Sequence, residues 1–298
     1  MIVFVALLLA GRLTPTNVGL LDAVRAFDRD ASLLPLDDVA RRATAEDVVL
    51  ARLDVLPSLD GVEPGLSLLE ELERRGVDVV NPAGALLTAH DKLATALKLA
   101  AAGVPHPRTA HIGDEGLAVA LSYPVVVKPR FGSWGQDVVR CEDERELAET
   151  LARFADRPWF RRQGAIVQEL VPPMSYDVRV LVAAGQVVGA VQRVAAPGEW
   201  RTNIALGGRR LPIVPSADVC AIALEAASAL GAGFVGVDLL PTRYGYVVIE
   251  LNGCVDFTPE YSFPGEDVFF EVAQALAAPV PALVEVPVAP LEAIPALD

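Results

Sequence analysis

The segment of residues 246–252 constrains this fold more than any other, because it places charge in a strand that is otherwise apolar. It reads Tyr-Val-Val-Ile-Glu-Leu-Asn, so Glu250 and Asn252 lie two residues apart. In a β-strand such residues point to the same face. An unpaired carboxylate buried among apolar side chains costs several kcal/mol. The sequence therefore predicts a cation, either a metal ion or a basic side chain, against the face that carries Glu250.

A second carboxylate, Asp238, lies twelve residues before Glu250 in another apolar run. Residues 241–245, between the two runs, contain proline and glycine and predict a hairpin turn. Paired strands would bring the side-chain oxygens of Asp238, Glu250 and Asn252 together. Oxygen ligands of this kind suit Mg²⁺, or Mn²⁺ in its place. The alternative is that Asp238 or Glu250 pairs with an arginine of the core.

The overall charge argues against several classes of partner. The chain has 298 residues, with 25 Lys and Arg against 39 Asp and Glu, which gives a formal net charge of −14. Nucleic acids and anionic membranes repel such a protein, so we expect neither as a partner. Its three cysteines, Cys141, Cys220 and Cys254, are far apart and show no metal-binding spacing, which favours a reducing cytoplasm.

Four segments of different pattern predict the domain organisation. Residues 1–89 alternate strand-like and helix-like stretches, which is typical of an α/β domain, and the apolar residues 1–10 predict a buried first strand of a parallel sheet. Residues 90–172 predict a small α+β lid, and residues 173–278 predict a C-terminal domain of antiparallel hairpins. The tail, residues 279–298, is rich in Pro and Ala and predicts an extended segment.

Within these segments, apolar periodicity and glycine or proline boundaries predict individual elements. Strands are predicted at residues 2–9, 47–53, 77–80, 124–129, 165–171, 177–183 and 187–194. Helices are predicted to start at Thr16 or Asn17 and end near Phe27, and to cover residues 66–75, 91–102, 142–154, 217–230 and 269–277.

Lys128 stands at the end of an apolar strand and is followed by a glycine-rich loop that contains Gly132, Ser133, Trp134 and Gly135. A lysine in such a strand is costly unless an anion meets it, and glycines let backbone N–H groups approach a phosphate. The pattern indicates a phosphate clamp, or else a snorkelling surface lysine before an ordinary turn. Lys92, one residue into its helix, could share a phosphate there or be a solvated helix lysine.

Three charged residues of the predicted hairpin at residues 177–194 form a second candidate group. Asp177 and Arg179 share one strand face, and Arg193 lies on the returning strand. They form either a cross-strand ion pair or a site in which guanidinium groups bind phosphoryl oxygens. Arg201 and Asn203 lie in a polar stretch before two glycines, which is either an active-site loop or a plain surface loop.

The order of these motifs resembles that of the ATP-grasp superfamily, and within it the RimK-like ligases. In order, the motifs are Asp91-Lys92-Leu93, Val127-Lys128-Pro129, Gly132-Ser133-Trp134-Gly135, Gln168-Glu169-Leu170, Asp177-Val178-Arg179, Arg193, Arg201-Thr202-Asn203, Gly207-Gly208, Val237-Asp238 and Glu250-Leu251-Asn252. The glycine loop and the residues after Asn252 look nearer to the LysX-type branch, which acts in lysine biosynthesis. The resemblance covers residues 47–277, roughly.

The resemblance implies an ATP-grasp fold with an N-terminal α/β domain, a central lid and a C-terminal antiparallel-sheet domain. It also implies an ATP-dependent carboxylate-amine ligase that works through an acyl phosphate. The implied roles are contacts to ATP phosphates (Lys92, Lys128 and the glycine loop), to adenine (Gln168, Glu169, Leu170), to the ribose or nearby polar groups (Asp177, with Arg179 beside it), to Mg²⁺ (Asp238, Glu250, Asn252), and to the transferred phosphate and acyl substrate (Arg193, Arg201, Asn203).

The resemblance leaves two kinds of amine acceptor open. LysX-type ligases modify an acidic carrier protein, and a chain with a net charge of −14 would repel it unless Arg161-Arg162 or Arg209-Arg210 forms a basic patch. Residues 253–260 also depart from the usual end of the RimK pattern. We therefore expect a free small amino acid as acceptor, with glutamate as the acid and Arg201 holding a substrate carboxylate. A homo-oligomer, dimer or tetramer, is expected. A nucleotide-binding protein without ligase activity is the remaining alternative.

Overall fold

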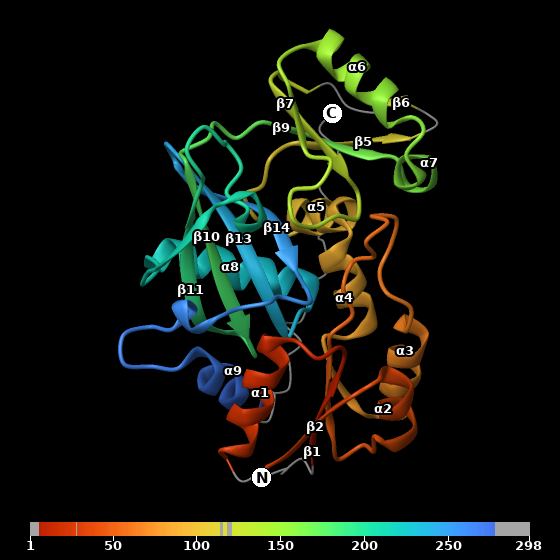
Figure 1. Ribbon diagram of the computed structural model, residues 1–298, viewed down its shortest axis with the longest axis vertical. Coiled ribbons are helices and arrows are strands. Elements are labelled where there is room, and N and C mark those ends of the chain that lie inside the picture. The colour runs from red at the N-terminus through yellow and green to blue at the C-terminus, as the bar shows by residue number, and fades with distance from the viewer. Residues whose placement is uncertain (1–5, 28, 114–115, 118–120, 278–298) are drawn as a thin grey trace, which may run out of the picture.

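The computed structural model describes residues 6–27, 29–113, 116–117 and 121–277, and in these residues three sheets carry the fold (Figure 1). The first is a parallel sheet with the strand order β2-β1-β3-β4. Its elements are β1 (Ala6–Ala10), α1 (Pro15–Arg25), β2 (Asp30–Leu34), α2 (Leu36–Arg42), β3 (Val48–Ala51), α3 (Leu66–Arg74), β4 (Asp78–Val80) and α4 (Ala83–His90). The predicted buried first strand of a parallel sheet is confirmed for its described residues.

Helix α1 starts earlier than the sequence predicted. Thr14, not Thr16 or Asn17, is its N-cap: the Thr14 side chain accepts a hydrogen bond from the N–H of Asn17, and Pro15 occupies the first turn, where it needs no donor. The prediction was wrong because three candidate capping residues, Thr14, Thr16 and Asn17, lie within four positions. Elements β2, α2 and α4 were not predicted. Strand β2 reads Asp-Ala-Ser-Leu-Leu and lacks the β-branched residues that identify a strand.

The second sheet belongs to the lid and has the order β6-β5-β9-β7-β8. It contains β5 (Thr109–Gly113), β6 (Gly116–Leu117), β7 (Val125–Pro129), β8 (Val139–Cys141) and β9 (Ala165–Glu169), and is joined by α5 (Lys92–Ala101), α6 (Glu144–Phe154) and α7 (Pro158–Gln163). Asp91 caps α5 by accepting from the N–H groups of Leu93 and Ala94, and Asp143 caps α6. Leu147 and Phe154 of α6 pack into the same apolar core as Val127.

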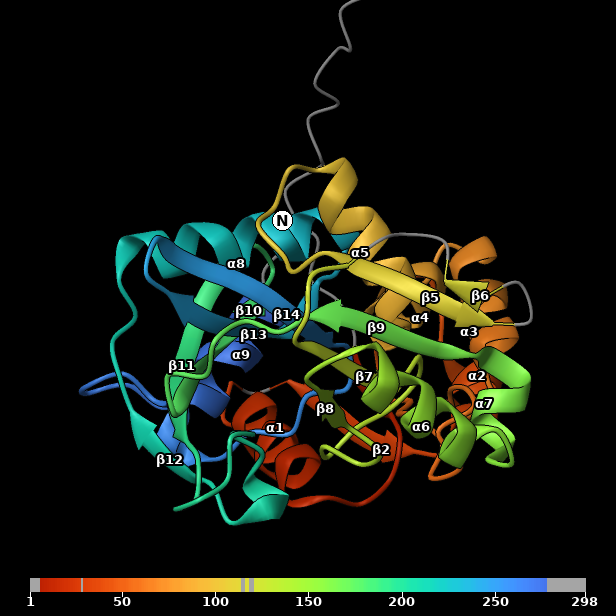
Figure 2. The same cartoon turned by 90° about the horizontal axis from the view of Figure 1, so that it is seen from above.

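The third sheet is antiparallel, with the order β12-β11-β10-β13-β14. Its elements are β10 (Tyr176–Ala183), β11 (Gln186–Val194), β12 (Arg209–Pro212), α8 (Ala217–Leu230), β13 (Phe234–Thr242) and β14 (Gly245–Asn252). Helix α8 lies along one face of this sheet (Figure 2) and shares an apolar core with it. Both predicted hairpins, β10–β11 and β13–β14, are confirmed by their antiparallel registers.

The last described helix, α9 (Val268–Ala277), returns to the first domain and packs beside α1 (Figure 1). Phe270 of α9 stacks on Phe27 with ring centroids 4.1 Å apart. Asn81, directly after β4, hydrogen-bonds to both backbone groups of Phe234 and so fixes the start of β13 against the first domain. The predicted tail of residues 279–298 lies outside the described residues. No described helix has the length and apolar character needed to cross a membrane.

Candidate functional site

One open cavity of about 220 Å³ brings the predicted site residues together. Residues of the lid and of the C-terminal sheet supply most of its lining, and Asp54 and His90 of the first domain also line it. Every residue that the sequence singled out as a site residue lines it: Lys92, Lys128, Gly132, Ser133, Trp134, Gly135, Gln168, Glu169, Leu170, Asp177, Arg179, Arg193, Arg201, Asn203, Asp238, Glu250 and Asn252.

A β-bulge in β14 aims Glu250 into this cavity. Asp238 pairs with Glu250 across the hairpin, but Leu239 pairs with Val248, so Ile249 is an extra residue with no partner. Without the bulge, Glu250 would share the core face with Val248. With it, Ile249 and Glu250 both line the cavity, while Val248 and Leu251 stay in the core. Asn252 then falls on the same face as Glu250, as the sequence predicted.

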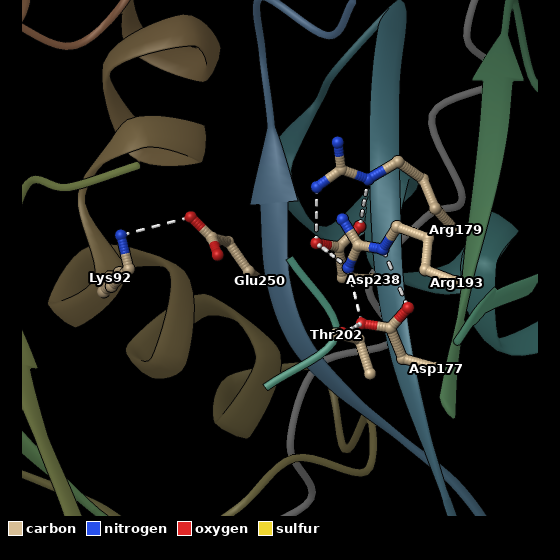
Figure 3. Close-up of polar contacts among 7 residues, drawn as sticks. All are labelled: Lys92, Asp177, Arg179, Arg193, Thr202, Asp238 and Glu250. Carbon is tan, nitrogen blue, oxygen red and sulfur yellow. Dashed lines mark hydrogen bonds and ion pairs between the residues drawn. The ribbon is translucent and has the colours of Figure 1, made fainter. Parts of the chain in front are cut away.

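Asp238 is held by two arginines (Figure 3). Its carboxylate accepts from Arg179 Nε at 2.5 Å, from Arg179 Nη2 at 2.6 Å and from Arg193 Nη2 at 2.9 Å. Burial by itself would raise the pKa of Asp238, but the two guanidinium groups outweigh it and hold that pKa below its ordinary value. The alternative that Asp238 pairs with a core arginine is therefore observed in this structure.

Asp177 extends the same row of charges toward the loop that carries Arg201 and Asn203, called the substrate loop below. Both its oxygens accept from Arg193, at 2.8 and 2.5 Å, and one also accepts from the hydroxyl of Thr202 (Figure 3). Asp177, Arg193 and Asp238 are all buried. Burial opposes the charge on Arg193, yet Asp238 and Asp177 raise its pKa well above the ordinary value. The guanidinium groups of Arg179 and Arg193 are therefore permanently charged and fixed in position at the cavity wall.

The two predicted phosphate lysines are both buried, with 9% of Lys92 and 6% of Lys128 exposed, so the alternatives of solvated or snorkelling lysines are wrong. Lys92 Nζ donates to the carbonyl of Gly132 at 2.6 Å and lies 3.1 Å from Glu250 Oε1, which links the glycine loop to β14 (Figure 3). Burial and the neighbouring Lys92 lower the pKa of Lys128 to about 8, against the opposing pull of Glu250 and Asp238.

The glycine loop of the lid touches the loop that carries Arg201 and Asn203. A Cβ atom on Gly135, whose φ is +73°, would lie 2.9 Å from Asn203 Oδ1. Arg201 Nη1 donates to the carbonyl of Gly135 at 3.2 Å. The rest of the Arg201 guanidinium is taken by Glu199, at 3.0 and 2.9 Å, and these bonds lower the pKa of Glu199 to about 2. Arg201 is thus already paired with an acid.

The segment predicted to hold adenine combines a polar edge with apolar walls. The N–H groups of Glu169 and Leu170 donate to backbone carbonyls of the lid, so they are not open to a ligand. Gln168 is buried, and its Oε1 has no hydrogen-bond partner. Apolar side chains from both domains also line the cavity: Val126, Val171, Leu240 and Ile249. This combination suits a flat heteroaromatic ring with exocyclic donors.

The donor set on β13 and β14 fits a hard cation that also takes ligands from elsewhere. Asp238, Glu250 and Asn252 offer the oxygens of two carboxylates and one amide to one cavity, and the Asp238 oxygens also accept from Arg179 and Arg193. Within the described part of the chain, no cluster of three His, Cys, Asp or Glu side chains could hold a metal. Mg²⁺ meets these conditions, because it keeps waters and shares phosphate oxygens.

Several lining residues were not predicted as site residues. Asp54 and Tyr261 belong to none of the proposed roles, and Arg210 was proposed only as part of a basic patch for a carrier protein, yet all three line the cavity. Arg210 could have been found from its alternation with Arg209 in a short strand, which places one of the two on the cavity face. Asp54 and Tyr261 carry no such signal, because only the packing of separate domains brings them to the site.

Comparison with known proteins agrees with this geometry. A family model described as a RimK-like ATP-grasp domain matches residues 89–275. A probable alpha-L-glutamate ligase of Thioalkalivibrio sulfidiphilus is 33% identical over 250 residues, which is 82% of this chain and 80% of that protein. An alpha-aminoadipate–LysW ligase of Sulfolobus acidocaldarius is 35% identical over 190 residues, 62% of this chain and 67% of that protein. The crystal structure of a RimK domain ATP-grasp protein from Sphaerobacter thermophilus superimposes with a TM-score of 0.65 at 24% identity, covering 92% of this chain and all of that one.

Proposed function

Because this chain belongs to the RimK-like ATP-grasp family of ATP-dependent carboxylate-amine ligases, we propose that it joins glutamate, or a similar small acid, to the amine of a free amino acid. The observation that carries the proposal is the convergence of two buried lysines and two arginines fixed by carboxylates, one buried and one half-buried, with three oxygen ligands on one cavity. The alpha-L-glutamate ligases among its relatives support glutamate as one of the two substrates.

The reaction has two steps that balance separately. A carboxylate oxygen of the acid attacks the γ-phosphorus of ATP, which forms the acyl phosphate and releases ADP. The amine then attacks the acyl carbon, an amide C–N bond forms, and the C–O bond to phosphate breaks, with loss of the amine proton. The protein's part is positioning and charge stabilisation. Arg179 and Arg193, held by Asp238 and Asp177, would stabilise the charge on the transferred phosphoryl group.

The remaining roles follow from position in the cavity. Lys92 and Lys128 would bind the ATP phosphates beneath the glycine loop, and adenine would occupy the slot beside Gln168, Glu169 and Leu170. The family uses ATP with Mg²⁺. Asp238, Glu250 and Asn252 would hold that Mg²⁺, which neutralises phosphate charge when bound; Mn²⁺ would replace it. Asn203 would face the acyl substrate. The ribose contact proposed for Asp177 competes with its bonds to Arg193 and Thr202.

Of the two predicted basic patches, Arg161-Arg162 is neutralised, which favours a free amino acid, whereas Arg209-Arg210 has no ion pair among the described residues and keeps an acidic carrier protein as the alternative. Arg161 is ion-paired with Asp156, and Arg162 with Asp60, so this pair offers no unneutralised patch. Beside Asn203, Arg201 is paired with Glu199. The alternative, supported by the LysX-type relative, is a ligase that modifies an amino-group carrier protein. We also propose that the protein is cytoplasmic and forms a homo-oligomer. It binds neither nucleic acid nor membranes.

Phosphate release from ATP tests this proposal. Purified protein with Mg²⁺ is incubated with a panel of amino acid pairs that includes glutamate, and product mass is recorded. We expect phosphate and an amide product only when both an acid and an amine are present. Phosphate release that requires an added acidic carrier protein would select the LysX-type alternative. No phosphate with any pair or carrier would contradict ligase activity on amino acids.

A further inference from the structure

Ion pairing accounts for most cationic side chains of the cavity. Within ion-pair distance, Arg179 meets Asp238, Arg193 meets Asp177 and Asp238, Arg201 meets Glu199, and Lys92 meets Glu250. Two lining cations, Lys128 and Arg210, have no such carboxylate among the described residues. Lys128 lies under the glycine loop, where ATP phosphate is proposed. Arg210 therefore remains as a cation that no described carboxylate contacts directly, although Glu260 lies near enough for Arg210 to help lower the pKa of that carboxyl.

Arg210 lies in β12, at the far edge of the C-terminal sheet. It pairs with Arg193 of β11 in the strand register, so both belong to the face that lines the cavity. Its Nε atom is buried and has no hydrogen-bond partner. A buried donor on a charged group is costly to leave unpaired, and a partner with two acceptor atoms would satisfy Nε and a terminal nitrogen together.

The loop before β12 brings Arg210 beside the substrate loop. The N–H of Gly208 donates to the carbonyl of Asn203 at 3.3 Å, and a Cβ atom on Gly208 would lie 2.6 Å from the carbonyl of Thr202. The chain can fold back this closely because residue 208 has no side chain. The backbone of Arg210, two residues later, therefore lies close to the loop that carries Asn203.

The position of Arg210 separates it from the nucleotide. In the strand order, β12 lies four spacings from β14, about 19 Å, and two from β10, about 10 Å. Glu250 on β14 lies against Lys92 at the phosphate end of the cavity. A ligand group at Arg210 is therefore at the opposite end of the row of charges from the ATP phosphates, beyond the arginines proposed to act on the transferred group.

We propose that Arg210 binds a substrate carboxylate that is not phosphorylated, and so selects an amino acid with a free carboxylate. This proposal rests on the proposed ligase function. It gives Arg210 the carboxylate-binding role that the sequence assigned to Arg201, because Arg201 is already paired with Glu199. A guanidinium binds a carboxylate through two parallel N–H···O bonds, which a lysine cannot do. The carboxylate could belong to the acid that is activated, as the second carboxylate of glutamate, or to the amine substrate.

Arg210→Gln tests this proposal, with Arg209→Gln as the matched control. Arg209 is the preceding residue of β12, exposed and on the opposite face, and it does not line the cavity. The Kd of L-glutamate, and of the best amine substrate from the panel, is measured by calorimetry with Mg²⁺ and a non-hydrolysable ATP analogue. Because Arg210→Gln loses a charge-assisted pair, it should raise one of these two Kd values about 10- to 100-fold and leave nucleotide affinity unchanged.

Analogues that lack one carboxylate assign the effect to a bond. If Arg210 binds the α-carboxylate of glutamate, wild type and Arg210→Gln should bind 4-aminobutyrate with the same Kd. If Arg210 binds the γ-carboxylate, the two proteins should bind glutamine with the same Kd. If it binds the amine substrate, the amide form of that amino acid should be insensitive. A purely structural role would weaken all of them alike. Arg210→Lys, which keeps the charge, should fall between wild type and Arg210→Gln.

The outcomes separate this proposal from the ligase function. Equal amino acid affinities for wild type, Arg210→Gln and Arg209→Gln would overturn the role of Arg210, while phosphate release by the same preparations would leave the ligase function standing. Wild-type protein that binds an amino acid through Arg210 but releases no phosphate would keep this site and contradict the ligase function. No binding of any amino acid to the wild type would overturn the Arg210 proposal.

Discussion

At the scale of single residues, the cavity keeps charges that folding alone would not favour. Lys128 is buried at the end of β7 and has no ion-pair partner among the described residues, so its charge is costly in the absence of a ligand. Arg193 is equally buried but is held between Asp177 and Asp238. The lysine is therefore poised to gain from an arriving anion, whereas the arginine is already fixed in position.

Lys128→Met should stabilise the protein without nucleotide and abolish its stabilisation by ATP. Burial lowers the pKa of Lys128 from 10.5 to about 8, so between these pH values the unfolded chain holds a proton that the folded chain has lost. The free energy of unfolding of the wild type should then rise with pH across this window. The advantage of the variant, measured by urea unfolding, should shrink from pH 7 to pH 10.

Thermal unfolding with Mg²⁺ and ATP supplies the second measurement for Lys128. The melting temperature of the wild type should rise with nucleotide, and that of Lys128→Met should not. Turnover should fall by a factor on the order of 10²–10³, as for the loss of one fixed charged contact. A variant that matches the wild type in ATP response and rate would refute the phosphate contact.

Asp177→Asn should cost both stability and turnover, because it leaves Arg193 with a single carboxylate partner. Removing one member of a buried ion pair typically destabilises by about 3–5 kcal/mol. Asp156→Asn is the control: it makes the same change in a surface pair with Arg161, where Asp156 is 92% exposed, and should have little effect. Equal losses of unfolding free energy in the two variants would show that the Asp177–Arg193 pair does not organise the site.

At the scale of elements, local sequence signals found the parts of the site but not their pairing. Helix α8 and both hairpins of the C-terminal sheet were predictable from apolar runs and turn residues. The bulge at Ile249 was not, because it depends on how β14 registers with β13. The pairing of Arg201 with Glu199 was missed for another reason: both residues lie in an irregular loop without periodicity.

The contact between the glycine loop and the Asn203 loop predicts different fates for two glycines. Gly135 and Gly185 have nearly the same φ, +73° and +72°, so alanine at either position meets similar backbone strain. Only at Gly135 would the added Cβ also meet another loop, at Asn203 Oδ1; at Gly185 nothing lies within 4 Å. Both substitutions should lower the melting temperature, Gly135→Ala at least as much as Gly185→Ala, but Gly135→Ala alone should reduce turnover. Equal turnover in both variants would argue against a functional loop contact.

At the scale of the whole molecule, the acidic surplus lies outside the cavity. The cavity lining carries six basic and six acidic side chains, 6 − 6 = 0, so the formal net charge of −14 belongs to the rest of the chain. A cavity of balanced charge inside an acidic molecule admits small zwitterions and a Mg²⁺-bound nucleotide more readily than an acidic protein. The fold class followed from motif order, whereas the meeting of three domains at one cavity could be seen only in the structure.

The central claim is that this cavity activates a carboxylate by phosphorylation, and oxygen-18 transfer tests it most directly. The acid substrate, labelled in its carboxylate oxygens, is incubated with protein, Mg²⁺, ATP and the amine, and the released phosphate is analysed by mass spectrometry. The acyl phosphate route predicts one labelled oxygen in each phosphate, because the C–O bond to phosphate breaks when the amine attacks. Phosphate without label, formed together with the amide product, would contradict the claim.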